Sequence, residues 1–229
     1  DKNYEGDCKF TSMQNGNEST TMRNLAKRHI FTRYNDADKI IDKVIKNNKS
    51  GKMLSEIVGP QTPFGLHTNF WDKDKQGKND VEVYTSKGLT YTNKDNVTSG
   101  RDLIDLYKVI FSKATSEHAG QADKSGKRRI FSKIEIIKPN TICTQSYLVA
   151  GSFKTFKQAK NLSTYLKTRF VRFMLFQALT SQDISREKFC FVPQIDFEKE
   201  IKDKELLKTF KLDSNEISII EELIKNFDE

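Results

Sequence analysis

Residues 144–197 read TQSYLVAGSFKTFKQAKNLSTYLKTRFVRFMLFQALTSQDISREKFCFVPQIDF, and this stretch decides most of the fold. An apolar run, a glycine turn and a long amphipathic pattern follow one another. They predict a strand over 144–150, one long helix over 156–177 and a short strand over 189–192. At 100° per residue, one side of the helix is apolar and carries Phe156, Ala159, Leu162, Leu166, Phe170 and Phe173. The opposite side carries Lys157, Lys160 and Lys167.

The charge of this helix has one sign. From Gly151 to Gln182 the chain has six basic residues and no Asp or Glu. A helix face that is merely solvated remains an alternative, but such a face normally mixes both signs. The apolar side has the pattern of a core face, without the exposed Trp and Leu stripe of a membrane-binding helix. The pattern therefore favours a polyanion such as nucleic acid as the partner.

Charge is also uneven along the whole chain. The 229 residues carry a formal charge of +8, whereas residues 196–229 carry −5, so residues 1–195 carry +13. This asymmetry predicts a basic working surface and an acidic, helical C-terminal piece that need not contact the ligand. The length allows one large domain or two small ones with a real core.

The cysteines and the apolar residues indicate the cellular compartment that is expected for this chain. Cys8, Cys143 and Cys190 are odd in number and far apart, which predicts neither disulfides nor a zinc site and indicates a reducing, cytoplasmic location. There is no apolar run near 18 residues and no signal peptide, so no membrane partner is expected. Because the chain starts without Met in the apparent middle of a fold, we expect a piece of a longer polypeptide.

The rest of the chain predicts an α+β fold of small mixed sheets with hairpins, the long helix and a C-terminal helical pair. One hairpin is expected over 7–21 with its turn at Asn15 and Gly16, and a helix over 34–47 with Asn35 or Asp36 as its cap. The other expected elements are a hairpin over 81–92, strands over 107–111 and 130–137, and helices over 204–210 and 214–227, the last capped by Ser214 or Asp213. Residues 112–129 form a polar loop that ends in a basic cluster.

Catalytic motifs are missing from the sequence. A metal-dependent nuclease needs clustered carboxylates and a lysine, and the nearest candidates are Asp80 with Glu82, or Glu135 with Lys138. Neither pair has the PD followed by (D/E)xK spacing. His29, His67 and His118 lie in unrelated contexts, and no GxGxxG or P-loop occurs. The chain also lacks the NPP(Y/F) motif of adenine methyltransferases, so catalysis by this chain alone is not expected.

Several phrases nevertheless resemble one family. They are DKNYEGDCKFTSMQNG, FTRYNDADKIIDKV, LSEIVGPQTPFGLHTNF, SYLVAGSFKTFKQAKNLSTYLKTRFVRFML, QDISREKFCFVPQIDF and DKELLKTFKLDSNEISIIEELIKNF. In this order they resemble the C-terminal region of type II restriction-modification adenine-N6 DNA methyltransferases, including the type IIG enzymes that are fused to an endonuclease. The terminal stretch departs from the family in lacking a Trp, since Glu198 to Ile201 stand there.

The resemblance implies a division of labour. Residues 1–28 would be the terminal hairpin of a preceding methyltransferase domain, and residues 29–229 would be the DNA target recognition domain. The parent enzyme would use S-adenosylmethionine, whose site lies upstream, and the partners would be double-stranded DNA and that upstream domain. A methyltransferase flips adenine out of the duplex, and a second domain must grip the DNA and read neighbouring bases.

Base reading uses Asn, Gln, Arg and Lys from loops, whereas phosphate contacts position the protein. The candidate DNA-binding residues are His67, Thr68, Asn69, Lys124, Lys127, Arg128, Arg129, Lys157, Lys160, Lys167, Gln182 and Arg186. For each of them an ordinary polar surface role is the alternative, and Trp71 is expected either to anchor its loop or to intercalate. Two other functions stay open: a divergent metal-dependent restriction nuclease, and a protein-interaction domain whose Lys-rich loop meets acidic partners.

Overall fold

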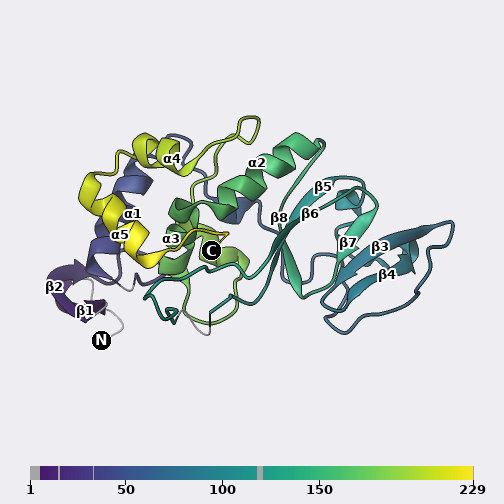
Figure 1. The fold of residues 1–229 in the computed structure, drawn as a ribbon, viewed down its shortest axis with the longest axis horizontal. Helices are drawn as coiled ribbons and strands as arrows, with labels where there is room; N and C mark the ends of the chain where they lie inside the picture. The colour runs from purple at the N-terminus through teal and green to yellow at the C-terminus, as the bar shows by residue number, and fades with distance from the viewer. Residues whose placement is uncertain (1–5, 15, 33, 118–120, 229) are drawn as a thin grey trace.

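The computed structural model describes residues 6–14, 16–32, 34–117 and 121–228, and it has the α+β class that the sequence predicted (Figure 1). The strands form a two-stranded sheet β1-β2 and two three-stranded sheets, β4-β3-β7 and β6-β5-β8. The strands are β1 (Asp7–Gln14), β2 (Asn17–Asn24), β3 (Asp80–Thr85), β4 (Gly88–Asn93), β5 (Tyr107–Ser112), β6 (Ile134–Ile137), β7 (Thr141–Cys143) and β8 (Tyr147–Phe153). The α-helices are α1 (Asn35–Asn47), α2 (Phe156–Lys167), α3 (Arg169–Ala178), α4 (Asp203–Thr209) and α5 (Ser214–Leu223). Short 3-10 helices are η1 (Leu54–Glu56), η2 (Lys94–Asn96), η3 (Arg101–Leu103) and η5 (Arg186–Phe191).

The β6-β5-β8 sheet separates two hydrophobic cores. Side chains alternate between the two faces of a strand, so Val109 and Phe111 of β5 join the core of the helices. Ile110 of β5 and Val149 of β8 join a smaller core with the β4-β3-β7 sheet. Figure 1 shows the helices on one side of this sheet and β3, β4 and β7 on the other. We call residues 59–106 and 137–146 the small lobe, and the helical remainder the large lobe.

A buried lysine closes the small lobe against the central sheet. The ammonium of Lys108 donates to the carbonyl oxygens of Leu103, Ile104 and Leu106 at 2.9, 2.8 and 2.7 Å. The side chain is fully buried, and this burial lowers its pKa to about 8. Lys108 therefore satisfies carbonyl oxygens at the end of η3 and in the turn that follows, where the backbone is buried or half-buried.

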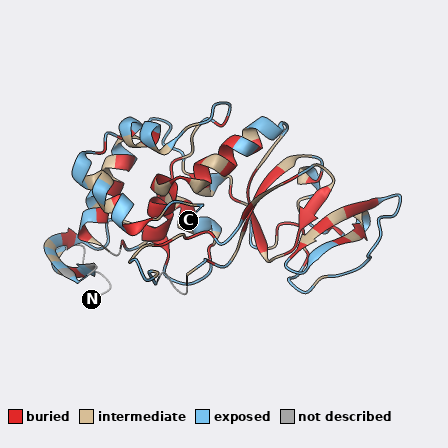
Figure 2. Ribbon diagram, viewed as in Figure 1, coloured by how far each residue is buried: buried red, intermediate tan, exposed pale blue. Residues whose placement is uncertain are grey.

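The predicted long helix is divided into α2 and α3 at Thr168. This residue has extended backbone angles (φ −61°, ψ 148°), and its hydroxyl accepts a hydrogen bond from Val171 N at 3.2 Å while donating to Tyr165 O at 2.7 Å. Thr168 is thus the N-cap of α3. The predicted core face is buried except for Phe156, which is 54% exposed and packs edge-on against Tyr107. Figure 2 shows α3 as a deeply buried helix, whereas α4 and α5 expose their outer faces.

Two further local predictions were wrong. Residues 189–191 belong to the 3-10 helix η5 rather than to a strand, because the Phe189 ring packs onto Phe111 and Phe131 of the large core. Tyr34 precedes α1 without a capping side chain, because the Asn35 amide donates instead to two carbonyl oxygens of the β1-β2 hairpin.

The other elements agree with the expected ones within a few residues. Both hairpins are present, although Asn15 of the first turn lies outside the described residues. The strand expected over 130–137 is confined to β6, and the C-terminal pair is α4 and α5. Asp213 caps α5 by accepting from the backbone N–H groups of Asn215 and Glu216, both at 3.0 Å.

The β1-β2 hairpin is tied to the start of α1. The Arg23 guanidinium donates to Thr32 O at 3.1 Å and to the Asp38 carboxylate at 3.0 Å. The domain boundary near residue 28 stays a prediction. The three cysteines are free thiols, and Cys143 is fully buried, which raises its pKa to about 12. Across the described ranges, every helix is too short or too polar to cross a bilayer.

Candidate nucleic-acid interface

Positive charge is concentrated in two segments that are distant in the sequence. Residues 153–182 contain six basic residues and no acidic one, and residues 112–133 contain six basic and two acidic residues. The net charges of the two segments are +6 and +4, and together they exceed the +8 of the whole chain. The remaining residues are therefore slightly acidic in sum. The small lobe, with seven basic and seven acidic residues, is neutral.

The fold brings the two basic segments together at the C-terminal end of the described chain. Arg128 N donates to Leu223 O at 2.9 Å, and Lys225 N donates to Arg128 O at 3.1 Å. From α3, Arg172 donates to Arg129 O at 3.2 Å and to Lys225 O at 2.8 Å. The C-terminal residues are thus held between the basic loop and the start of α3.

Arg172 is the central residue of this contact. It is fully buried, and besides these two carbonyls it donates from Nε to Lys167 O at 3.1 Å and to Thr168 O at 3.2 Å. Burial lowers the pKa of Arg172 to about 10, so the guanidinium is still charged at neutral pH. Its donors are directed at carbonyls, so its role is to join the segments rather than to contact a ligand.

Three cations surround the Phe227 ring. The guanidinium carbons of Arg129 and Arg172 lie 4.7 and 5.4 Å from the ring centroid, and Lys167 Nζ lies 5.1 Å from it. Such contacts are attractive because the ring face is electron-rich. Phe227 therefore holds cations of both basic segments close together despite their mutual repulsion.

A cleft of about 610 Å³ opens beside Phe227, and we call it the C-terminal cleft. Its lining includes the cations Lys160, Lys167, Arg169, Arg172 and Lys202, with Asp203 and Asp228 as the acids. Asp203 is engaged at the N-terminus of α3, because its carboxylate accepts hydrogen bonds from Arg169 N at 2.8 Å and from Phe170 N at 2.9 Å.

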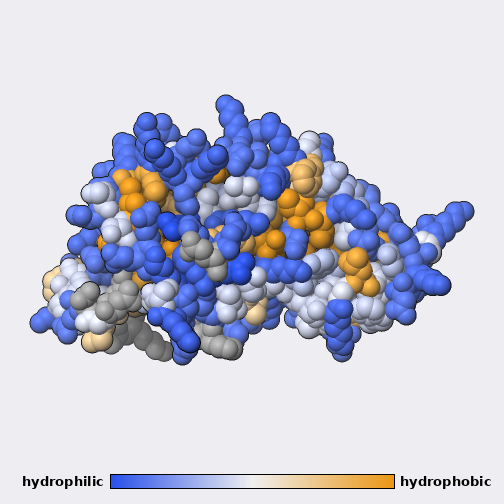
Figure 3. Space-filling view, in the orientation of Figure 1, coloured by the Kyte–Doolittle hydropathy of each residue, from blue (hydrophilic) through white to orange (hydrophobic). Residues whose placement is uncertain are grey.

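The lysines at this cleft are the groups available to an anion. Lys160 and Lys202 are exposed, and within the described part of the chain neither takes part in an ion pair. Lys157, one turn before Lys160, is also exposed. Arg169 is less available to an anion than these lysines, because its guanidinium forms an ion pair with the Glu221 carboxylate at 3.3 Å. In Figure 3 hydrophobic residues gather near β6 and β8.

The predicted basic cluster of the loop is only partly on the surface. Lys124 is exposed and Lys127 half-buried, but Arg128 is buried with its guanidinium 4.7 Å from the Phe176 ring centroid. Asp123 organises the loop by accepting from Ser125 and from Lys225 Nζ at 2.9 Å. These hydrogen bonds hold the pKa of Asp123 well below its usual range.

The predicted readers His67, Thr68 and Asn69 lie in the small lobe, away from the C-terminal cleft. All three are exposed, and His67 Nδ1 lies 3.2 Å from Gln145 Oε1. Their loop is positioned by Phe64 and Leu66, which are buried in the small core.

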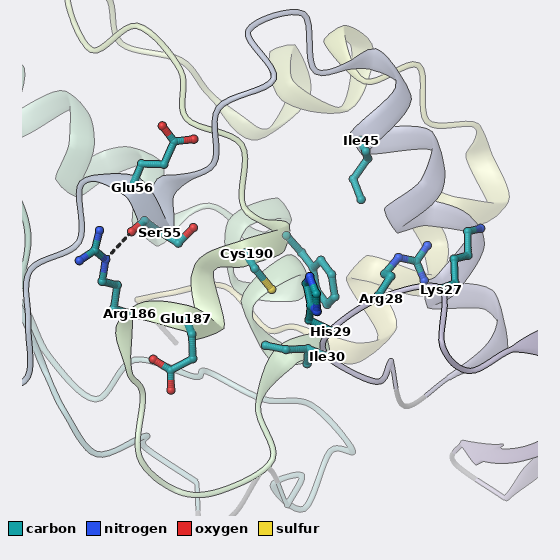
Figure 4. A pocket seen from close by; sticks show the side chains of 11 residues that line it. Lys27, Arg28, His29, Ile30, Ile45, Ser55, Glu56, Arg186, Glu187 and Cys190 are labelled. Atoms are coloured by element: carbon teal, nitrogen blue, oxygen red, sulfur yellow. Dashed lines mark hydrogen bonds between the residues drawn. The ribbon is translucent and has the colours of Figure 1, made fainter. Parts of the chain in front are cut away.

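Gln182 and Arg186 occupy a third location. The Gln182 side chain is exposed, and its backbone oxygen accepts from Thr115 N at 2.9 Å. Arg186 Nε donates to Ser55 O at 2.8 Å at one side of a pocket of about 840 Å³, with Lys27 and Arg28 at the other side (Figure 4). Cys190 lies between them, and burial raises its pKa to about 11, so it is a protonated thiol at neutral pH.

Of the predicted residues, Lys160 and Lys167 therefore line one cleft, with Lys157 one turn away on α2. Arg129 lies beside this cleft, against the Phe227 ring. The structure places the His67 loop and Arg186 elsewhere. Sequence reasoning missed Lys202 and Phe227 because it assigned the acidic C-terminal piece no part in the site. The sequence signal was weak: an aromatic residue two positions after Lys225.

The carboxylates considered for a nuclease have structural contacts. Asp80 pairs with Lys73 at 2.9 Å and accepts from Gly77 N at 2.8 Å. Glu82 accepts from the Thr141 hydroxyl at 3.1 Å and lies 3.6 Å from Lys138. In the residues that the structure describes, no three His, Cys, Asp or Glu side chains are grouped to hold a metal ion.

Comparison with protein-family models finds no family that matches the chain, and comparison with curated proteins finds no matching sequence.

Proposed function

We propose that this chain is the DNA-binding recognition region of an adenine-N6 DNA methyltransferase from a restriction-modification system. In this role it would grip duplex DNA for an upstream catalytic domain that uses S-adenosylmethionine. The sequence resemblance suggests the parent enzyme. The single observation that carries DNA binding is the meeting of two basic segments at the C-terminal cleft.

Phosphate binding follows from the physical character of this cleft. Lys157, Lys160 and Lys202 are exposed lysines without ion pairs in the described residues, and Lys167 lies beside them. Lysines that bind DNA phosphates displace the cations condensed on them, and the release of these cations into solution increases entropy and favours binding. The cleft is too small for a duplex, so it would receive backbone phosphates at the edge of a longer contact along α2.

The neutral small lobe suits the second task of recognition. Phosphate contacts carry no sequence information, whereas hydrogen bonds to base edges do. His67, Thr68 and Asn69 are exposed hydrogen-bonding side chains on a loop that is anchored in a core. We assign base reading to this loop and backbone binding to the large lobe.

The test is salt-dependent binding of labelled duplex DNA, followed by fluorescence anisotropy. The variant with Lys157, Lys160 and Lys167 each changed to Gln should bind more weakly. In a plot of the logarithm of the binding constant against the logarithm of the salt concentration, the slope should also become less steep by about 3. Each phosphate contact contributes about 0.9 to this slope. The matched control replaces Lys46, Lys49 and Lys208, which lie together at a different cleft, and changes the net charge equally.

Equal loss in both triple variants would show that only net charge matters, and would refute the assigned surface. Binding to heparin as tight as binding to duplex DNA, measured with the catalytic domain present, would refute sequence reading.

A further inference from the structure

Trp71 is the single tryptophan of the chain, and it is 45% exposed. Large aromatic side chains are mostly buried, and an exposed one that is held in place commonly serves binding. Trp71 lies in the small lobe, directly after His67, Thr68 and Asn69.

One hydrogen bond orients the indole at the surface. Its Nε1 donates to Asp74 Oδ1 at 3.0 Å. The following backbone is fastened to β4: the N–H groups of Asp72 and Lys73 donate to the Thr90 hydroxyl at 3.2 and 3.1 Å. Lys73 and Tyr91 also exchange two backbone hydrogen bonds of 3.1 and 3.0 Å. A binding partner would therefore meet an indole that loses little freedom on contact.

We propose that Trp71 stacks on a base whose face is exposed in the bound DNA, an inference that rests on the proposed function. Base–aromatic stacking needs a rigid ring and tolerates any base. Phe70 packs against the small core, and the exposed hydrogen-bonding side chains His67, Thr68 and Asn69 stand two to four residues before Trp71. Residues 72–75 carry two aspartates and two lysines, so this segment has no net charge that attracts phosphate. The exposed indole face is therefore the group that it offers to a base.

A protein partner would require a different surface. Protein interfaces have a contiguous apolar centre. Among the described residues of the small lobe, Leu89 is the other large hydrophobic side chain of similar exposure, at 46%. A single ring among polar side chains instead matches the stacking platforms of nucleic-acid-binding proteins.

The state of the DNA decides which ligand Trp71 prefers. In an intact duplex both faces of each base are covered by its neighbours. Removing one base from the stack exposes the faces on either side of the gap, which is the state that base flipping creates. We therefore expect Trp71 to favour a duplex with one abasic position over the matched intact duplex.

Because Trp71 is unique, its intrinsic fluorescence reports stacking directly. The full chain is titrated with the abasic duplex and with the intact duplex, while anisotropy of a label on the DNA reports binding. The fluorescence should be quenched by the abasic duplex. Trp71→Ala should weaken binding of the abasic duplex about 5- to 150-fold, the range for loss of one stacked base. Trp71→Phe should keep most of the affinity, and the matched control Leu89→Ala should change neither readout.

The outcomes separate this inference from the function on which it rests. If the abasic duplex binds while Trp71 fluorescence stays constant, or if Trp71→Ala binds it normally, stacking is refuted and DNA binding stands. An equal loss for both duplexes also refutes stacking on an exposed base. If neither duplex binds at low salt, the proposed function fails and the inference fails with it. Circular dichroism of each variant confirms that it is folded.

Discussion

Arg172→Met tests the contact that assembles the basic surface. The guanidinium is fully buried and donates four hydrogen bonds to carbonyl oxygens, those of Lys167 and Thr168 within the helices and those of Arg129 and Lys225 outside them. Met fills a similar volume but donates nothing. The Thr168 carbonyl still accepts a hydrogen bond from Arg172 N, and the Arg129 carbonyl still accepts one from Phe131 N. The substitution therefore mainly affects the carbonyls of Lys167 and Lys225, which lose the guanidinium as their donor.

The magnitude follows from those two carbonyls. An unsatisfied buried polar group costs about 1–3 kcal/mol, and the removed charge regains some desolvation energy, so we expect the free energy of unfolding to fall by about 2–4 kcal/mol. In a chain of this size that lowers Tm by about 4–15 °C. Urea denaturation followed by circular dichroism measures the change directly.

Two comparisons make the prediction specific. Arg169→Met removes a cation three residues earlier whose partner Glu221 is about half exposed, so it should cost less than about 1 kcal/mol. Arg172→Lys should rescue little, because an ammonium has three donors and cannot span the same carbonyls. A change below about 0.5 kcal/mol in Arg172→Met, or an equal change in Arg169→Met, would refute the reasoning.

Two further predictions concern the small lobe and its contact with the central sheet. The pKa of Lys108 is about 8 in the folded chain, because burial disfavours its charged form, and 10.5 for a lysine in the unfolded chain. Between these two pH values the unfolded chain therefore binds more protons. The free energy of unfolding should therefore rise with pH in this window by at most about 3 kcal/mol, and fall as pH drops toward 8. Denaturation at several pH values should show this slope in the natural chain and not in Lys108→Met; equal slopes would contradict it. Gly65→Ala should destabilise by about 1–3 kcal/mol more than Gly51→Ala, in the same denaturation assay. Both glycines have positive φ. A Cβ at Gly65 would clash with Thr98 Oγ1, whereas a Cβ at Gly51 would meet nothing within 4 Å. Equal losses of stability in the two variants would show that the Thr98 side chain moves aside.

Elements whose signals are local were predicted well. The β3-β4 hairpin follows from alternating Val81 and Val83 and a glycine at its turn, and α5 follows from the Asp213 cap. The break at Thr168 was missed because a threonine inside an amphipathic pattern does not by itself announce a cap. Its role depends on Asp203, which accepts the first N–H groups of α3 from 34 residues away.

The error at residues 189–192 has a similar cause. Phe189 and Phe191 alternate with Cys190 as in a strand. Yet no neighbouring strand pairs with this segment in the described residues, and Phe189 instead fills the space between Phe111 and Phe131. Tertiary packing overrides a short local pattern of this kind.

By itself the sequence determined the α+β class, the apolar and basic sides of residues 156–177 and the segregation of charge along the chain. These properties depend on residue type and on a spacing of a few residues. Only the tertiary structure decided which cations meet: it buried Arg172 and Arg128, and it placed Phe227 among Arg129, Lys167 and Arg172. The physical reason is that burial and convergence depend on contacts between residues about 40 to 100 positions apart, which no local periodicity records.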